Sequence, residues 1–105
     1  MEVIWHEKAR RQLEEAMDYC MERFGSRVTK RIINQIDKDV SLLSQNPYMG
    51  AVEGSLGEEF LEYRYLIEGP AKLIYTVEDG YVFIHLYWDC RQEPRSLWNL
   101  LKETE

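Results

Sequence analysis

The sequence predicts one α+β domain in which an antiparallel two-helix hairpin packs on an antiparallel β-sheet. Two periodicities carry this prediction. Hydrophobic residues recur at intervals of three and four through residues 6–46, as on the buried face of a helix, and at intervals of two within residues 60–88, as in strands. A length of 105 residues suits a single domain, which we expect to span residues 1–105.

The first half of the chain contains a short strand followed by two helices. An apolar run at residues 3–5 predicts the strand. Gly25 ends the first helix, Ser26 is placed to cap the second, and Asn46-Pro47 ends the second. Because the connection between the helices is so short, they must run antiparallel. The expected buried residues are Ala9, Leu13, Ala16, Met17, Cys20, Met21 and Phe24 in the first helix, and Val28, Ile32, Ile36, Val40 and Leu43, flanked by Ile33 and Leu42, in the second.

The second half of the chain predicts a three-stranded meander. Residues 47–58 are rich in glycine and form a loop, and strands are expected at residues 60–67, 71–78 and 81–88. The Asp79-Gly80 pair between the last two strands is a strong hairpin signal. A short helix is expected at residues 94–101. We expect the helix hairpin to cover one face of the sheet and the other face to stay partly open to a partner.

Composition limits the classes of function. The net charge is −6 and the pI is about 5.0, so any contact with nucleic acid must rest on a local basic patch. No apolar run approaches the roughly 20 residues of a membrane span, and the N-terminus has no signal segment, so we expect a cytoplasmic protein. Cys20 lies in a helical apolar stripe and is expected to be a buried free thiol. The scattered histidines and cysteines predict no metal site, and no cofactor is expected.

An ordered set of short motifs gives the chain a family resemblance. The set extends over residues 3–95 and consists of Phe24-Gly25, Leu43 with Asn46-Pro47 and Gly50, Tyr63-Arg64-Tyr65-Leu66, Leu73-Ile74-Tyr75-Thr76-Val77, Asp79-Gly80 and Asp89-Cys90-Arg91-Gln92-Glu93-Pro94. In this order, the motifs resemble the RelE/ParE superfamily of bacterial toxins. The resemblance implies a toxin that an antitoxin encoded beside it neutralises. RelE-like toxins enter the ribosomal A site and cleave mRNA, whereas ParE-like toxins inhibit DNA gyrase.

The cleavage alternative requires cations that stabilise a developing phosphorane charge. The candidates are Arg64, Lys72 and Arg91, with Arg95 nearby, and arginine suits the task because its planar fork pairs with phosphate at two points. Strand alternation places Arg64 on the face of Leu66 and turns Lys72 away from the residues beside it, which are expected to be buried. The alternative is that all four cations are solvated or paired with the nearby acids Glu62, Glu68 and Glu93.

The general acid or base of a nuclease is harder to find in this sequence. Related nucleases often carry a tyrosine or histidine in the C-terminal segment, where residues 95–98 offer neither. His85 is expected to share a strand face with Phe83 and Tyr87, and a lone strand histidine is more often packed than catalytic. Tyr75 and Tyr87 are possible substitutes, if they reach the substrate.

These residues favour a toxin that acts by protein–protein binding. Trp88, Trp98 and Arg95 are the predicted partner-binding residues, although the two tryptophans equally fit a core beneath the short C-terminal helix. Our leading hypothesis is a ParE-like inhibitor of DNA gyrase whose second partner is its cognate antitoxin. The alternatives are a ribosome-dependent mRNA endonuclease that uses Arg64, Lys72 and Arg91, with ribosome and mRNA as partners, and a non-toxic relic that still binds the antitoxin.

Overall fold

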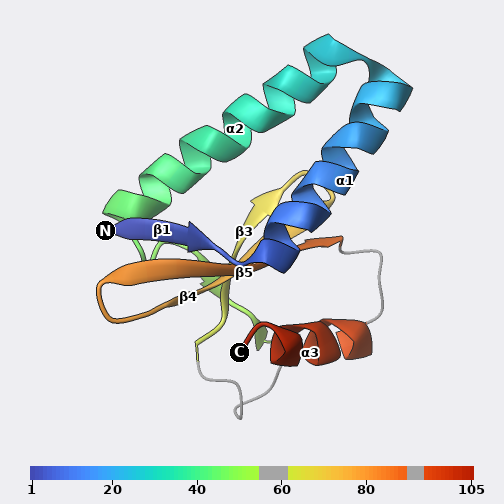
Figure 1. Ribbon diagram of the computed structural model, residues 1–105. Helices are drawn as coiled ribbons and strands as arrows, with labels where there is room; N and C mark the ends of the chain where they lie inside the picture. Colours follow the sequence, from blue (N-terminus) through green and yellow to red (C-terminus); the bar gives the residue numbers. More distant parts are fainter. Residues whose placement is uncertain (55–61, 90–93) are drawn as a thin grey trace.

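The computed structural model describes residues 1–54, 62–89 and 94–105, without the side chains of residues 94–96 and 98. It shows the α+β fold that the sequence predicts (Figure 1). The elements in chain order are β1 (Glu2–Trp5), α1 (Glu7–Phe24), α2 (Ser26–Gln45), β2 (Ala51–Val52), β3 (Arg64–Glu68), β4 (Ala71–Val77), β5 (Tyr81–Asp89) and α3 (Pro94–Glu103). The predicted strand at residues 60–67 starts later than expected, because Glu62 has a φ of 62°, and residues 60–61 lie outside the described part.

The strands form one mixed sheet in the order β1-β5-β4-β3-β2. The meander of β3, β4 and β5 is antiparallel, as predicted, and Gly80 takes the positive φ that its hairpin turn requires. Two features differ from the expectation. β1 runs parallel to β5, so the sheet is not wholly antiparallel, and β2 pairs with β3 inside the expected loop. The pairing of β1 with β5 could not be predicted because no local turn connects these strands. β2 could not be predicted because a strand of two residues is too short to show an alternating pattern.

The helix hairpin turns on a single residue. Gly25, with a φ of 86°, both ends α1 and precedes α2, so Ser26 is the first residue of α2 and not its cap. Thr29 supports the turn, because its hydroxyl donates to the carbonyl oxygen of Gly25 at 2.9 Å. At the other end of α1, Nδ1 of His6 accepts the backbone N–H of Lys8 at 3.0 Å and serves as the N-cap.

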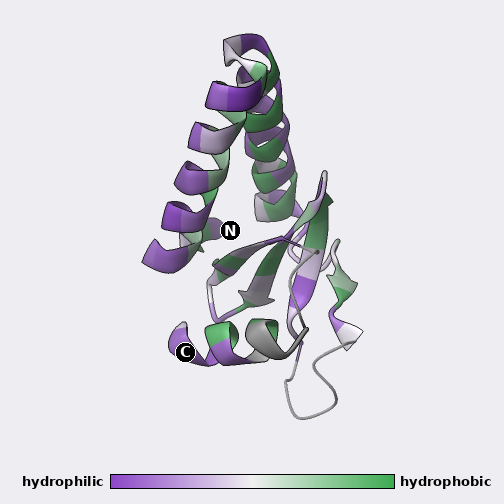
Figure 2. Cartoon of the chain, turned by 90° about the vertical axis from the view of Figure 1, so that its right-hand side faces the viewer, coloured by the Kyte–Doolittle hydropathy of each residue, from purple (hydrophilic) through white to green (hydrophobic). Residues whose placement is uncertain are grey.

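The first core lies between the hairpin and the sheet. It consists of Ala9, Ile36, Leu43, Leu73, Tyr75, Val82 and Ile84. The hairpin is longer than the sheet is wide, so its far end projects beyond the strands (Figures 1 and 2). Met21 and Phe24 lie on that end and are 46% and 59% exposed, although the helical period predicted them to be buried. Periodicity identifies a face, but it does not say how far the neighbouring sheet extends.

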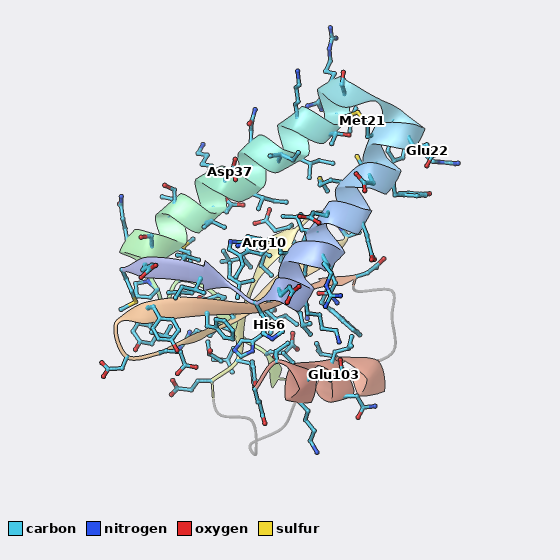
Figure 3. All side chains as sticks on the ribbon, in the orientation of Figure 1. His6, Arg10, Met21, Glu22, Asp37 and Glu103 are labelled. Carbon is cyan, nitrogen blue, oxygen red and sulfur yellow. The ribbon has the colours of Figure 1, made fainter. Side chains whose placement is uncertain are left out.

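A second core lies on the opposite face of the sheet, under α3 (Figure 1). Its members are Tyr63, Ile74, Leu86, Trp88, Leu97 and Leu101. An ion pair between Lys8 of α1 and Glu103 of α3 joins the two layers at one edge. Glu103 is labelled in Figure 3. α3 covers part of the face that was expected to stay partly open, because α3 is amphipathic and buries its apolar side there.

A β-bulge in β5 changes which face its residues occupy. Tyr75 pairs with Ile84 and Ile74 pairs with Leu86, so His85 is the extra residue of β5. Before the bulge, Phe83 and His85 share the α3 face, as predicted, and their rings lie 4.7 Å apart. After the bulge the alternation is reversed, and Tyr87 packs against the hairpin core instead. The prediction that Tyr87 shares a face with His85 was wrong for this reason.

Candidate functional site

Arg64, the first candidate cation, braces the loop between α2 and β2. It pairs across the sheet with Tyr75 and so lies on the hairpin face, as the alternation predicted. Its Nη1 donates to the carbonyl oxygen of Gly50 at 2.9 Å and to that of Tyr48 at 3.4 Å, and its guanidinium carbon lies 5.2 Å from the centre of the Tyr48 ring. Nη1 of Arg64 is therefore engaged by the protein's own backbone.

Tyr75 holds the same loop from below. Its hydroxyl donates to the carbonyl oxygen of Pro47 and accepts the N–H of Gly50, both at 2.9 Å. Burial raises the pKa of Tyr75, although the Gly50 hydrogen bond and the charge of Arg64 act in the opposite direction. A fully buried, protonated hydroxyl with two backbone partners is a structural group and a poor general base.

Lys72, the second candidate cation, lies on the other face of the sheet. It pairs across the sheet with Trp88, a member of the second core, and so points away from the hairpin, as predicted. Its ammonium binds a carboxylate oxygen of Glu53 at 2.8 Å and lies 4.2 Å from the centre of the Tyr65 ring. Glu53 is only 5% exposed, so Lys72 neutralises a buried carboxylate.

The structure therefore does not bring the described nuclease candidates together. Arg64 and Lys72 face opposite sides of the sheet, and each has its own partners within the chain. Arg91 lies outside the described residues, as does the side chain of Arg95. One phosphate group cannot contact Arg64 and Lys72 through opposite faces of the same sheet.

His85 is a core histidine with both ring nitrogens engaged. It is 4% exposed, Nε2 lies 2.8 Å from the hydroxyl of Thr76, and Nδ1 lies 2.7 Å from that of Thr104. The rings of Phe83 and Tyr63 pack against it edge-on. Burial, with a smaller contribution from the charge of His6, lowers the pKa of His85 to about 4. The ring is thus neutral at pH 7 and fastens the end of α3 to the sheet.

This environment predicts acid lability. The pKa of His85 is depressed in the folded state, so its contribution is complete above the unfolded value of 6.5 and is lost as the pH falls toward 4. We expect about 2 kcal/mol of unfolding free energy to disappear between pH 7 and pH 5. Urea titrations at both pH values measure it. In His85→Gln, which keeps His6, this part of the pH slope should vanish; an unchanged slope would assign the effect to other groups.

The carboxyl groups of Glu68 and Asp39 form a pair that was not predicted from the sequence. Glu68, the last residue of β3, is 7% exposed, and its neighbour across the hairpin interface is Asp39 of α2. Burial, followed by the hydrogen bond and the negative charge of Asp39, raises the pKa of Glu68 to about 8. The alternation of Arg64, Leu66 and Glu68 on one face was the signal that this acid points inward. From the sequence, Glu68 was considered only as a possible partner of the candidate cations.

Several apolar side chains stay exposed near the C-terminal end of α2. Leu42, Asn46, Pro47, Tyr48 and Met49 line a shallow hollow there. Tyr48 and Met49 are 60% and 46% exposed, and nearby Val52 of the edge strand β2 is 57% exposed. Contiguous exposed apolar surface of this kind marks sites of protein contact.

The comparison with known proteins decides the family. Residues 3–87 match the model of the ParE toxin of the type II toxin–antitoxin system parDE. The chain belongs to the ParE toxin family. Among solved structures, it is similar to the chromosomal ParDE toxin–antitoxin system from P. aeruginosa, with a TM-score of 0.65, 23% identity, and coverage of 85% of this chain and 94% of that chain. A search of curated protein sequences finds no match.

The match confirms the predicted superfamily and its ParE-like branch. In this ParE-family chain, Trp88 is 4% exposed and fills the core beneath α3, so a partner would reach it only if α3 moved. The Trp98 side chain, the other predicted anchor, lies outside the described part. Cys20 is a buried free thiol, as predicted. Among the described residues, no cluster suits a metal ion and no helix is long and apolar enough to cross a membrane.

Proposed function

We propose that this ParE-family toxin inhibits DNA gyrase by protein–protein binding and that a cognate antitoxin neutralises it. Membership of the ParE family supports the toxin role directly. The observation that favours gyrase over mRNA is the placement of Arg64 and Lys72 on opposite faces of the sheet, each bound inside the chain. Both proposed partners act inside a bacterial cell, so we place the toxin in the cytoplasm.

The described acid–base candidates fit mRNA cleavage poorly. A ribonuclease must deprotonate a ribose hydroxyl, so its base needs hydrogen-bond reach of the substrate. His85 lies beneath α3 with both nitrogens engaged, and Tyr75 is fully buried with two backbone partners. The pKa of Tyr87 is raised chiefly by burial and also by the charges of Glu68, Asp89 and Cys20. Tyr87 is therefore protonated and a poor base.

The antitoxin part of the proposal is supported by the relatives and by the surface. Both the family model and the solved relative are described as parts of parDE toxin–antitoxin systems. The apolar residues that the free chain leaves exposed, including Tyr48 and Met49, are the kind of surface that a folding-on-binding segment covers.

Gyrase supercoiling tests the proposal. Purified protein should abolish supercoiling of relaxed plasmid by gyrase, and an equimolar amount of the antitoxin from the adjacent reading frame should restore it. The matched arm is mRNA on translating ribosomes, which should stay intact. Supercoiling that persists at high toxin excess refutes gyrase as the target. Codon-position cleavage that Arg91→Ala abolishes would establish the endonuclease, and normal growth of cells expressing the chain alone would indicate a relic.

A further inference from the structure

The inner face of α2 carries one acid among its apolar residues. Asp39 lies three residues after Ile36 and four before Leu43, and both of these residues are buried in the first core. Asp39 therefore points toward the sheet, where its partner in the helix is the side-chain amide of Gln35 at 3.0 Å. A carboxylate at this position breaks the pattern that the rest of α2 follows, and such departures are expected at functional positions.

Glu68 meets Asp39 from the sheet. Its side chain is more than nine-tenths buried, and its Oε1 has no hydrogen-bond partner. Neither acid takes part in the ion pairs formed among the described residues, which join Lys8 to Glu103 and Lys72 to Glu53. A buried acceptor without a donor costs the free chain stability, so a donor supplied from outside would be bound favourably.

The groups around this pair are acidic or neutral. Asp39 faces Glu68 from α2. Three more groups lie on the same side of the sheet: Tyr87 and Asp89 of β5 and Cys20 of α1. The charges of Glu68, Asp89 and Cys20 all raise the pKa of Tyr87, so these groups lie close together. None of these groups can supply a cation. Two adjacent carboxyl groups match the forked donors of a guanidinium, which can bind here once Glu68 has lost its proton.

We propose that Asp39 and Glu68 together bind one arginine side chain of the antitoxin. The inference rests on the proposed antitoxin and adds the position and chemistry of one contact. A path to the pair runs along α2, where Gln35, Asp39, Leu42 and Asn46 follow one another at helical spacing. Leu42 and Asn46 also line the apolar hollow, so a segment lying on α2 would place an apolar side chain in the hollow about 10 Å from its arginine.

The proposal implies that binding releases a proton. In the free chain the pKa of Glu68 is about 8, so roughly 1% of this carboxyl is ionised at pH 6 and about 90% at pH 9. The arginine binds the ionised form. The antitoxin should therefore bind the wild-type chain at least tenfold more tightly at pH 9 than at pH 6, and calorimetry in phosphate and Tris buffers at pH 7 should show close to one proton released.

Three variants test the contact by calorimetry with the purified antitoxin. Glu68→Gln and Asp39→Asn should each weaken binding at pH 9 about tenfold or more, and Glu68→Gln should also abolish the pH dependence and proton release. Asp37→Asn is the matched control, because Asp37 is exposed on α2 two residues away (Figure 3) and its loss should leave affinity within twofold. Replacing each antitoxin arginine by alanine should identify one whose effect disappears in the Glu68→Gln background.

The outcomes separate the two levels of inference. Wild-type affinity and pH dependence in both Glu68→Gln and Asp39→Asn would overturn the arginine site, while the toxin–antitoxin pair would stand. An antitoxin that fails to bind the wild-type chain would overturn the neutralisation proposal, and the arginine site with it. Misfolding does not confuse the test, because Glu68→Gln removes a buried carboxyl and is expected to unfold at higher urea than wild type above pH 7.

Discussion

Replacement of Gly50 by alanine is expected to lower the unfolding free energy by about 3 kcal/mol or more. A Cβ at this position would lie 2.6 Å from the backbone oxygen of Tyr65 and 2.6 Å from the hydroxyl of Tyr75. The Tyr65 oxygen belongs to β3, which is paired on both sides, so it cannot move away without disturbing the sheet. The same shift would break the Gly50 hydrogen bonds to Tyr75 and Arg64.

Thermal and urea unfolding measure this effect, and the chain supplies its own control. Gly54 lies four residues further along, has an ordinary φ, and has open space where a Cβ would stand, so Gly54→Ala should change stability by less than about 0.5 kcal/mol. Tyr75→Phe should cost about 2 kcal/mol by itself. Combined with Gly50→Ala, it should cost less than the sum, because both act at one contact. Equal stability of Gly50→Ala and Gly54→Ala would refute the close packing of this loop.

Loss of the Lys72 side chain is expected to cost about 2–4 kcal/mol. The side chain of Glu53 is 4% exposed and that of Lys72 is 24% exposed, so Lys72→Ala takes an ammonium away from a carboxylate that water barely reaches. The packing of Lys72 on the Tyr65 ring is lost at the same time. Urea unfolding measures the change, and Lys30→Ala, on the exposed surface of α2, should stay within about 0.5 kcal/mol of wild type.

The double variant Glu53→Gln/Lys72→Met separates structure from chemistry. It replaces the ion pair by neutral groups of similar size and should recover most of the stability that Lys72→Ala loses. Growth arrest by the double variant should match that by wild type, since Lys72 has a structural role here. If stability recovers while toxicity is abolished, Lys72 acts on the target and the structural assignment is wrong.

The helix hairpin and the meander could be predicted because their signals are local. The apolar period through Ile36 and Leu43 identifies a helix face, Gly25 supplies a turn that other residues rarely adopt, and Asp79-Gly80 joins adjacent strands. Each of these signals depends on residues within a few positions of one another. The alternation that placed Arg64 and Lys72 also held, because the pairing of β3 with β4 is regular and the bulge lies in β5.

The candidate site was predicted less well, since its contacts join residues far apart in the chain. Arg64 and Lys72 are plausible phosphate ligands by sequence alone. In the structure, Arg64 donates to the backbone of the loop at Gly50, and Lys72 forms an ion pair with Glu53. His85 looked like an ordinary strand residue, and no local pattern marks it as the extra residue of a bulge. The same holds for Glu68, whose burial depends on where α2 crosses the sheet.

The amino-acid sequence by itself determined the α+β class, with its helix hairpin and meander, because hydrophobic periodicity and turn residues are properties of neighbouring positions. The order of its short motifs also indicated the ParE-like family. Tertiary structure alone decided that β1 is parallel to β5, that α3 closes the second face over Trp88, and that Asp39 meets Glu68. These outcomes depend on which distant surfaces pack together and on how much water they exclude. Charge and reactivity follow from that exclusion of water, so Arg64 and Lys72, two of the three nuclease candidates, are internal supports.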